Sequence, residues 1–129
     1  MVKVEAARKW FKQAVHDLEM GKKNIEFGGY DVASFLAHQA VEKLLKAGFI
    51  MEGKSVPRKH FIDELARELN LPQDLQIKIA DLIPDYALSR YPDVSEKVPY
   101  EEYTKEMAER KINIASSVLE YFKNRWGSL

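Results

Sequence analysis

One short stretch of the chain carries three side chains that could together bind a phosphate or a nucleotide. Ser89-Arg90-Tyr91-Pro92-Asp93 places a guanidinium, a phenol and a carboxylate around a proline. Arg90 offers five N–H donors in a rigid fork that matches carboxylate or phosphate oxygens. Tyr91 offers a face on which a base could stack, and Asp93 could accept a hydrogen bond from a base edge or a ribose hydroxyl. The structural alternative is that Arg90 pairs with Asp93 and Tyr91 lies in the core.

A second group of polar side chains follows one line along a helix predicted between residues 31 and 52. Its members recur at spacings of three and four, with two further residues one step round the helix: Asp31, Ser34, His38, Glu42 and Lys46, then Gln39 and Lys43. Residues at these spacings stack on one side of a helix. Periodicity favours the interpretation that this polar strip is the solvated side, with Glu42 and Lys46 as an i,i+4 pair.

The other interpretation is that the polar strip faces a cleft or a partner. Lys43 and Lys46 would then bind phosphate, with Glu42 and Gln39 as orienting groups. His38 is a candidate for proton transfer, although a lone histidine on a mostly buried helix is more often a hydrogen-bonded core residue. The sequence predicts no catalytic residue, and His38 and Arg90 are the first candidates if the chain is an enzyme.

The elements that must position these groups are all predicted to be helices. Apolar residues recur with helical spacing over 4–27, 31–52, 61–69, 72–87 and 100–126, and no stretch alternates as a strand does. Gly28-Gly29 and Gly53 end the first two helices, Asp31 is the expected N-cap of the second, and Pro84 is expected to bend the fourth. The sequence predicts a single all-α domain over 1–129, a four- to five-helix up-and-down bundle.

Composition excludes several kinds of site. The 129 residues carry 20 basic and 20 acidic side chains and no cysteine, so disulfides, thiol catalysis and zinc–thiolate sites are ruled out. The three histidines are dispersed, which argues against a metal site, and no glycine-rich phosphate loop is present. The charged N-terminus lacks the apolar region of a signal peptide, and no run is long enough to span a membrane. We therefore expect a cytoplasmic protein.

Taken in order along nearly the whole chain, these motifs resemble the HEPN domain family. The segments that carry the resemblance are Trp10, Ala14 and Asp17-Leu18, then Gly29-Tyr30-Asp31, then FLAHQAVEKLLKA from Phe35 to Ala47, then His60, then Ser89-Arg90-Tyr91-Pro92-Asp93. The resemblance implies a small helical domain, often dimeric, proposed to bind nucleotides. It also implies a partner, because many prokaryotic members act beside a minimal nucleotidyltransferase in a toxin–antitoxin pair.

Other members of that family are metal-independent RNases, in which a histidine follows an arginine by four to six residues. No histidine follows Arg90 in this chain, and Arg58 precedes His60 by only two residues. The chain therefore resembles the nucleotidyltransferase-associated branch more closely. The resemblance therefore implies a non-catalytic homodimer. It implies no intrinsic cofactor beyond a bound nucleotide, with a nucleotide or RNA as the ligand. The alternatives are an RNase that uses Arg90 with His38 or His60, and a structural role in which the dimer only occupies a partner.

Overall fold

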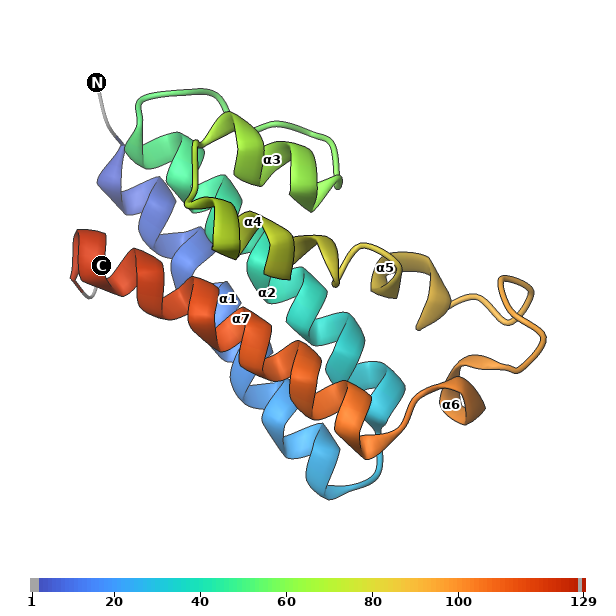
Figure 1. Ribbon diagram of the computed structural model, residues 1–129. Coiled ribbons are helices and arrows are strands. Elements are labelled where there is room, and N and C mark those ends of the chain that lie inside the picture. Colours follow the sequence, from blue (N-terminus) through green and yellow to red (C-terminus); the bar gives the residue numbers. More distant parts are fainter. Residues whose placement is uncertain (1–2, 128) are drawn as a thin grey trace.

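Three long helices form the body of the computed structural model, which describes residues 3–127 and 129. They are α1 (Val4–Glu26), α2 (Tyr30–Met51) and α7 (Lys105–Trp126). Helix α2 packs against both α1 and α7, and the short connection at 27–29 makes α1 and α2 neighbours (Figure 1). The prediction of an all-α bundle is confirmed. Within the described residues, no helix has the length and apolarity that crossing a membrane requires.

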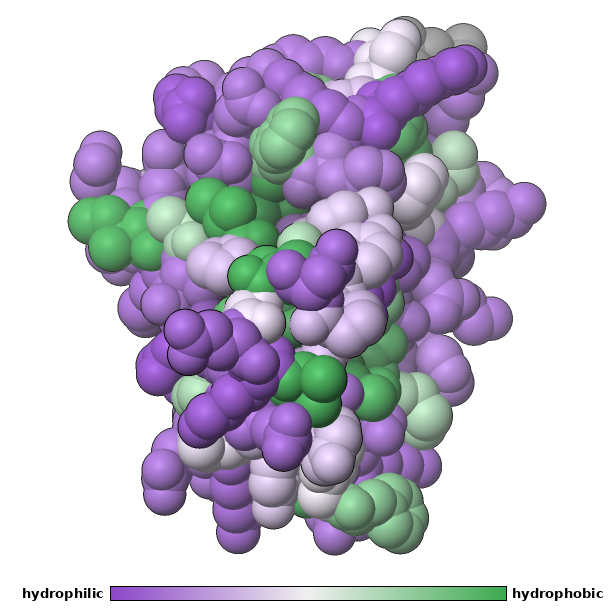
Figure 2. Space-filling view, turned by 90° about the vertical axis from the view of Figure 1, so that its right-hand side faces the viewer, coloured by the Kyte–Doolittle hydropathy of each residue, from purple (hydrophilic) through white to green (hydrophobic). Residues whose placement is uncertain are grey.

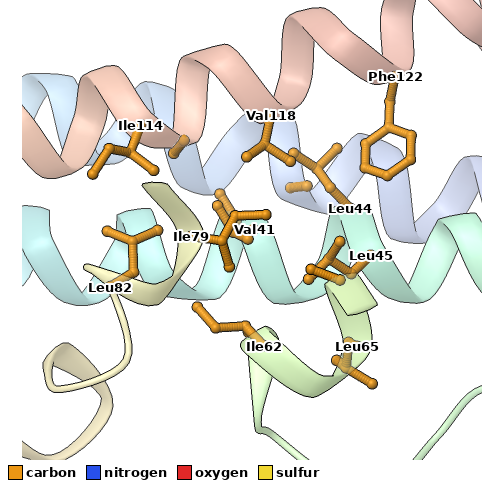
Figure 3. Close-up of a cluster of buried hydrophobic side chains, with 14 of the residues drawn as sticks. Val41, Leu44, Leu45, Ile62, Leu65, Ile79, Leu82, Ile114, Val118 and Phe122 are labelled. Atoms are coloured by element: carbon orange, nitrogen blue, oxygen red, sulfur yellow. The ribbon is translucent and has the colours of Figure 1, made fainter. Parts of the chain in front are cut away.

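The hydrophobic core lies along α2. Alanines at 33, 37, 40 and 47 are fully buried and allow α1 and α7 to approach closely. Gly21 of α1 serves the same purpose, because a Cβ there would lie 2.7 Å from Cδ1 of Ile112. Larger side chains from α2, α3, α4, α7 and the turn after α4 fill the remaining volume (Figure 3): Val41, Leu44, Leu45, Ile62, Leu65, Ile79, Leu82, Ile114, Val118 and Phe122. Apolar residues that recur every 3.6 residues form one face of each helix, and these faces are buried together in such a core.

Four shorter helices complete the chain, and two of the predicted helices are divided. They are α3 (Ile62–Glu68), α4 (Gln73–Ala80), α5 (Asp85–Leu88) and α6 (Pro99–Glu102). The fourth predicted helix does not bend at Pro84 but ends at Ala80, and a turn over 81–84 precedes α5. Helix α2 begins at Tyr30, and its N-cap is Gly29, two residues before the predicted N-cap Asp31.

The last predicted helix is also divided. Tyr103 is extended, with φ −93° and ψ 135°, and separates α6 from α7. The hydroxyl of Thr104 accepts a hydrogen bond from the backbone N–H of Met107 at 3.2 Å, which caps the new helix. The break allows the Tyr103 side chain to turn inward, where it is 3% exposed.

Buried polar contacts fix the segment between α4 and α7. We call Asp85, Tyr103 and Lys111 the buried ion network. The Tyr103 hydroxyl donates to Oδ1 of Asp85, and Lys111 Nζ lies 2.9 Å from Oδ2 of the same carboxylate. Lys111 also donates to the backbone carbonyl of Asp81 at 2.5 Å. These contacts attach α5 to α7, and α5 carries part of the candidate site.

Candidate functional site

Four members of the polar strip of α2 are buried, and Asp31, Gln39 and Lys43 are half-buried. Ser34, His38, Glu42 and Lys46 are exposed by 0%, 1%, 5% and 5%. The interpretation as the solvated side of the helix was therefore wrong, because α3, α5 and the residues before α3 cover this side of α2. Periodicity places residues on a helical line but does not show which other segments pack over that line.

Glu42 is the centre of the buried part of the strip. Its Oε2 accepts a hydrogen bond from Lys46 Nζ at 3.0 Å and lies 2.7 Å from Nδ1 of His60. Its Oε1 lies 4.0 Å from Nδ1 of His38, and neither of these two atoms has a hydrogen-bond partner in the described part of the chain. The contact between Glu42 Oε2 and His60 Nδ1 thus fixes the orientation of the His60 ring.

The two imidazoles around Glu42 have different environments. Burial lowers the pKa of His38 to about 4, and the nearby Glu42 carboxylate, which acts in the opposite direction, does not compensate. His38 is therefore neutral at pH 7 and carries one N–H donor and one acceptor nitrogen. His60 has a side chain that is 52% exposed, so its ring is fixed on one side by Glu42 and accessible on the other.

The ring of Tyr86, on α5, lies beside three side chains: His38, His60 and Arg90. Its ring centroid lies 5.2 Å from that of His60 in a stacked arrangement and 5.4 Å from that of His38. The guanidinium carbon of Arg90 lies 4.3 Å from the same ring centroid. We call His38, Glu42, His60, Tyr86 and Arg90 the Tyr86 cluster.

Arg90 is exposed, yet several contacts hold its guanidinium in place. Its Nε donates to the backbone carbonyl of Tyr86 at 2.9 Å, and its Nη2 donates to the Tyr91 hydroxyl at 2.9 Å. The rings of Tyr91 and Phe35 lie 4.8 and 5.1 Å from its guanidinium carbon. The fork is therefore pre-positioned, and two of its five N–H donors are occupied by these bonds.

A pocket of about 490 Å³ adjoins the Tyr86 cluster. Its lining is mostly apolar and comprises Phe61, Ile62, Ile83, Pro84, Ala87, Leu88 and Val94, together with Lys59, His38, His60 and Tyr86. Three of the apolar members remain substantially exposed: Phe61, Ile83 and Val94. Figure 2 views the molecule from the side that carries α5 and α6 and shows separate apolar side chains, from the left edge to the middle, on a largely hydrophilic face. We call this cavity the apolar pocket.

Comparison with known proteins identifies the fold. Residues 7–126 match the model of the HEPN domain. The chain belongs to the HEPN domain family. It is 30% identical to "Putative toxin MJ1304" of Methanocaldococcus jannaschii, over 94% of this chain and 88% of that protein.

Two solved structures confirm this HEPN architecture. TT1696 from Thermus thermophilus superposes with a TM-score of 0.87 at 31% identity, covering 92% of this chain and 97% of that one. ST0689, an archaeal HEPN homologue, superposes with a TM-score of 0.80 at 37% identity, covering 97% and 98%.

Of the predicted site residues of this HEPN chain, only some lie together. Arg90, Tyr91, Glu42 and His38 are in or beside the Tyr86 cluster. Lys46 is turned inward, bonded to Glu42 and 5.7 Å from the Trp10 ring centroid, so it does not face the surface. The expected phosphate role of Lys46 is not supported by this position.

The remaining predicted residues lie outside the cluster. Lys43 donates to Asp17 of α1 at 2.5 Å and joins two helices, and Gln39 is half-buried one turn before it. Asp93 is exposed and, in the part of the chain that the structure describes, forms no ion pair with Arg90 within 4.0 Å. The structural alternative, in which Arg90 pairs with Asp93 and Tyr91 lies in the core, is therefore wrong, since Tyr91 is also 47% exposed.

Sequence reasoning missed Tyr86 and Phe35 as site residues. Both lie inside the predicted helices over 31–52 and 72–87, where an aromatic residue counts as one of the recurring apolar residues. The signal that could have located Tyr86 is its spacing of four residues from Arg90, which stacks the two side chains on one face of a helical turn.

Proposed function

We propose that this HEPN protein binds a nucleotide, or the phosphate backbone of RNA, through Arg90. The observation that carries the proposal is the exposed guanidinium held by Tyr86, Tyr91 and Phe35 at the edge of a pocket. A planar fork that is already oriented loses less side-chain entropy when it binds a phosphate in bidentate fashion.

We further propose that the protein acts as a homodimer with a separate minimal nucleotidyltransferase in a toxin–antitoxin pair. The similarity to a relative named as a toxin supports this role. Light scattering of the purified protein should give twice the mass of the chain, and a mass of one chain would contradict the dimer.

The nucleotide proposal is tested by a thermal-shift titration with ATP, GTP, CTP, UTP and a short single-stranded RNA. A ligand at 100 times its Kd should stabilise the fold by about 2.7 kcal/mol. Arg90→Lys keeps the charge but removes the fork, so it should weaken the shift. Arg58→Lys, an exposed arginine outside the Tyr86 cluster, is the matched control and should leave the shift unchanged. No shift with any ligand would refute binding by this chain alone.

A second candidate function is metal-independent cleavage of RNA. The observation that favours it is the 2.7 Å contact between Glu42 and His60, since an imidazole oriented by a buried carboxylate is suited to proton transfer. Arg90 lies on the same Tyr86 ring, although neither histidine of the cluster stands at the family spacing from it. Cleavage of a labelled RNA in EDTA should disappear in His60→Gln and persist in His16→Gln. Absence of cleavage in the wild type would leave binding as the function.

A further inference from the structure

The apolar pocket has one unpaired cation at its edge, and this combination defines a class of ligand. We propose that the apolar pocket binds a medium-length aliphatic chain whose anionic head group, a carboxylate or a phosphate, pairs with Arg90. Such a ligand differs in class from the nucleotide proposed above. It shares only Arg90 with that nucleotide, so the two ligands compete for the same guanidinium.

The wall of the apolar pocket is suited to hydrocarbon. Its apolar members come from three segments: Phe61 and Ile62 at the start of α3, the residues from Ile83 to Leu88, and Val94. The Nδ1 atoms of its two histidines are directed to the Glu42 carboxylate, at 4.0 Å for His38 and 2.7 Å for His60. A polar group buried against this wall would lose hydrogen bonds to water without replacing them. The part of the ligand inside the pocket is therefore apolar.

Two cations adjoin the apolar pocket, and they differ in whether a carboxylate already neutralises them. Lys59 belongs to the lining, but its Nζ donates to Oε1 of Glu68 at 2.7 Å. Arg90 packs on the ring of Tyr86, a member of the wall, with 4.3 Å between the guanidinium carbon and the ring centroid. Among the residues that the structure describes, Arg90 forms no ion pair. Because a guanidinium fork pairs well with a carboxylate or a phosphate, the head group belongs at Arg90.

The aromatic members of the wall favour an aliphatic chain over a planar ring. The Tyr86 ring already carries His60, stacked at 5.2 Å, and the Arg90 guanidinium. Phe61 lies at the mouth and is 61% exposed. A planar ligand needs a flat aromatic face on which to stack, whereas a flexible chain adapts to branched side chains such as Ile83 and Leu88.

The test is isothermal titration calorimetry of the full chain with hexanoate, octanoate and decanoate, each below its micelle concentration. The pocket volume of about 490 Å³ lies within the range of about 300–1,000 Å³ that small-molecule sites have. Affinity should rise about fourfold per added methylene until the chain fills the pocket, with one ligand bound per chain. Octanoate should bind about tenfold more tightly than octanamide, which has the same shape and no charge. Octyl phosphate, compared with octanoate, identifies which of the two head groups Arg90 prefers.

Paired variants separate the head group from the tail. Arg90→Gln should lower octanoate to the affinity of octanamide, and Arg58→Gln, an exposed arginine outside the lining, should change neither affinity. Ala87→Phe fills the pocket and should remove the dependence on chain length.

A second pair of variants covers the case in which Ala87→Phe does not fold. Val94→Asp places a negative charge at the mouth from a 52% exposed loop position and should weaken octanoate but not octanamide. Val32→Asp makes the same change at a 44% exposed position outside the lining and should leave both affinities as they are.

Several results would overturn the inference. Affinity that does not depend on chain length would exclude the apolar pocket, and equal binding of octanoate and octanamide would exclude Arg90. Tighter binding of 2-naphthoate than of decanoate would identify a planar occupant, and a loss in Lys59→Gln but not in Arg90→Gln would move the head group. A thermal shift by nucleotides without binding of any aliphatic anion would overturn this inference alone. Absence of both would overturn the proposed nucleotide site as well.

Discussion

The body of long helices and the segment from Asp81 to Thr104 are held in place by different forces. The long helices bury alanines and branched aliphatic side chains along α2, so their stability grows with apolar area. The Asp81–Thr104 segment is attached by the buried ion network and by the stacking of Arg90 on Tyr86. Apolar contacts tolerate many exchanges of similar volume, whereas each buried polar group requires one partner. The segment that carries the candidate site is thus the part with the less exchangeable contacts.

Removal of Lys111 should produce the largest loss of stability. Lys111→Met leaves Asp85 as a buried carboxylate without its cation, and the expected loss is about 3–5 kcal/mol in the free energy of unfolding, measured by urea denaturation at pH 7. Burial raises the pKa of Asp85, although hydrogen bonds from Tyr103 and Lys111 act in the opposite direction. The loss should therefore shrink as the pH falls and Asp85 is protonated. A loss that is independent of pH would mean that packing, rather than the charge, explains the effect.

A truncation in the apolar core should cost nearly as much. Leu45→Ala removes a fully buried side chain beside Leu65 and should destabilise the protein by about 2–5 kcal/mol. Leu36→Ala, on the same helix but only half-buried, is the control and should cost less. Unlike Lys111→Met, neither variant should show a loss that depends on pH. A pH-dependent loss in Leu45→Ala would remove the contrast between the two regions.

His38 should make stability depend on pH. Its pKa is about 4 in the folded protein against 6.5 for an ordinary histidine, so the unfolded chain takes up a proton that the folded chain does not. The contribution is fully present above pH 6.5 and is lost as the pH falls from 6.5 toward 4, by up to about 3 kcal/mol. His38→Gln should flatten this part of the stability curve relative to the wild type. An identical slope in both proteins would show that His38 is not the group responsible.

The smallest effect on stability should come from the most functional residue. Arg90→Lys loses the aromatic stacking of the guanidinium, which at an exposed position contributes about 0.5–1 kcal/mol. Its melting temperature should therefore stay near that of the wild type while nucleotide affinity falls. A large loss of stability would mean that Arg90 is a structural residue and would remove it from the site.

Helical periodicity predicted the long helices and the side of each that is buried, because apolar spacing reports on burial. It did not predict the breaks at Ala80 and Tyr103, where tertiary contacts of Asp85, Tyr103 and Lys111 outweigh local helix propensity. It also placed the polar strip in solvent, since only the fold shows that α5 and His60 cover Glu42.

The candidate site was also predicted only in part, because the sequence shows proximity only for residues that are close along the chain. Arg90 and Tyr91 stand in one recognisable motif, so their proximity was certain from the sequence. His60 is 18 residues from Glu42 along the chain, and Tyr86 lies 26 residues beyond His60. The arginine-to-histidine spacing of the RNase members is counted along the sequence. It therefore does not detect His60, which the fold brings to the same tyrosine ring as Arg90.

The most direct test uses the three histidines as internal probes. Long-range proton–nitrogen NMR spectra of the uniformly labelled protein, recorded during a titration with AMP, report on His16, His38 and His60 separately. The account predicts that the ring signals of His38 and His60 shift in a saturable manner, while those of His16, exposed on α1, stay in place. Binding that leaves both His38 and His60 unchanged would contradict the assignment of the site to the Tyr86 cluster.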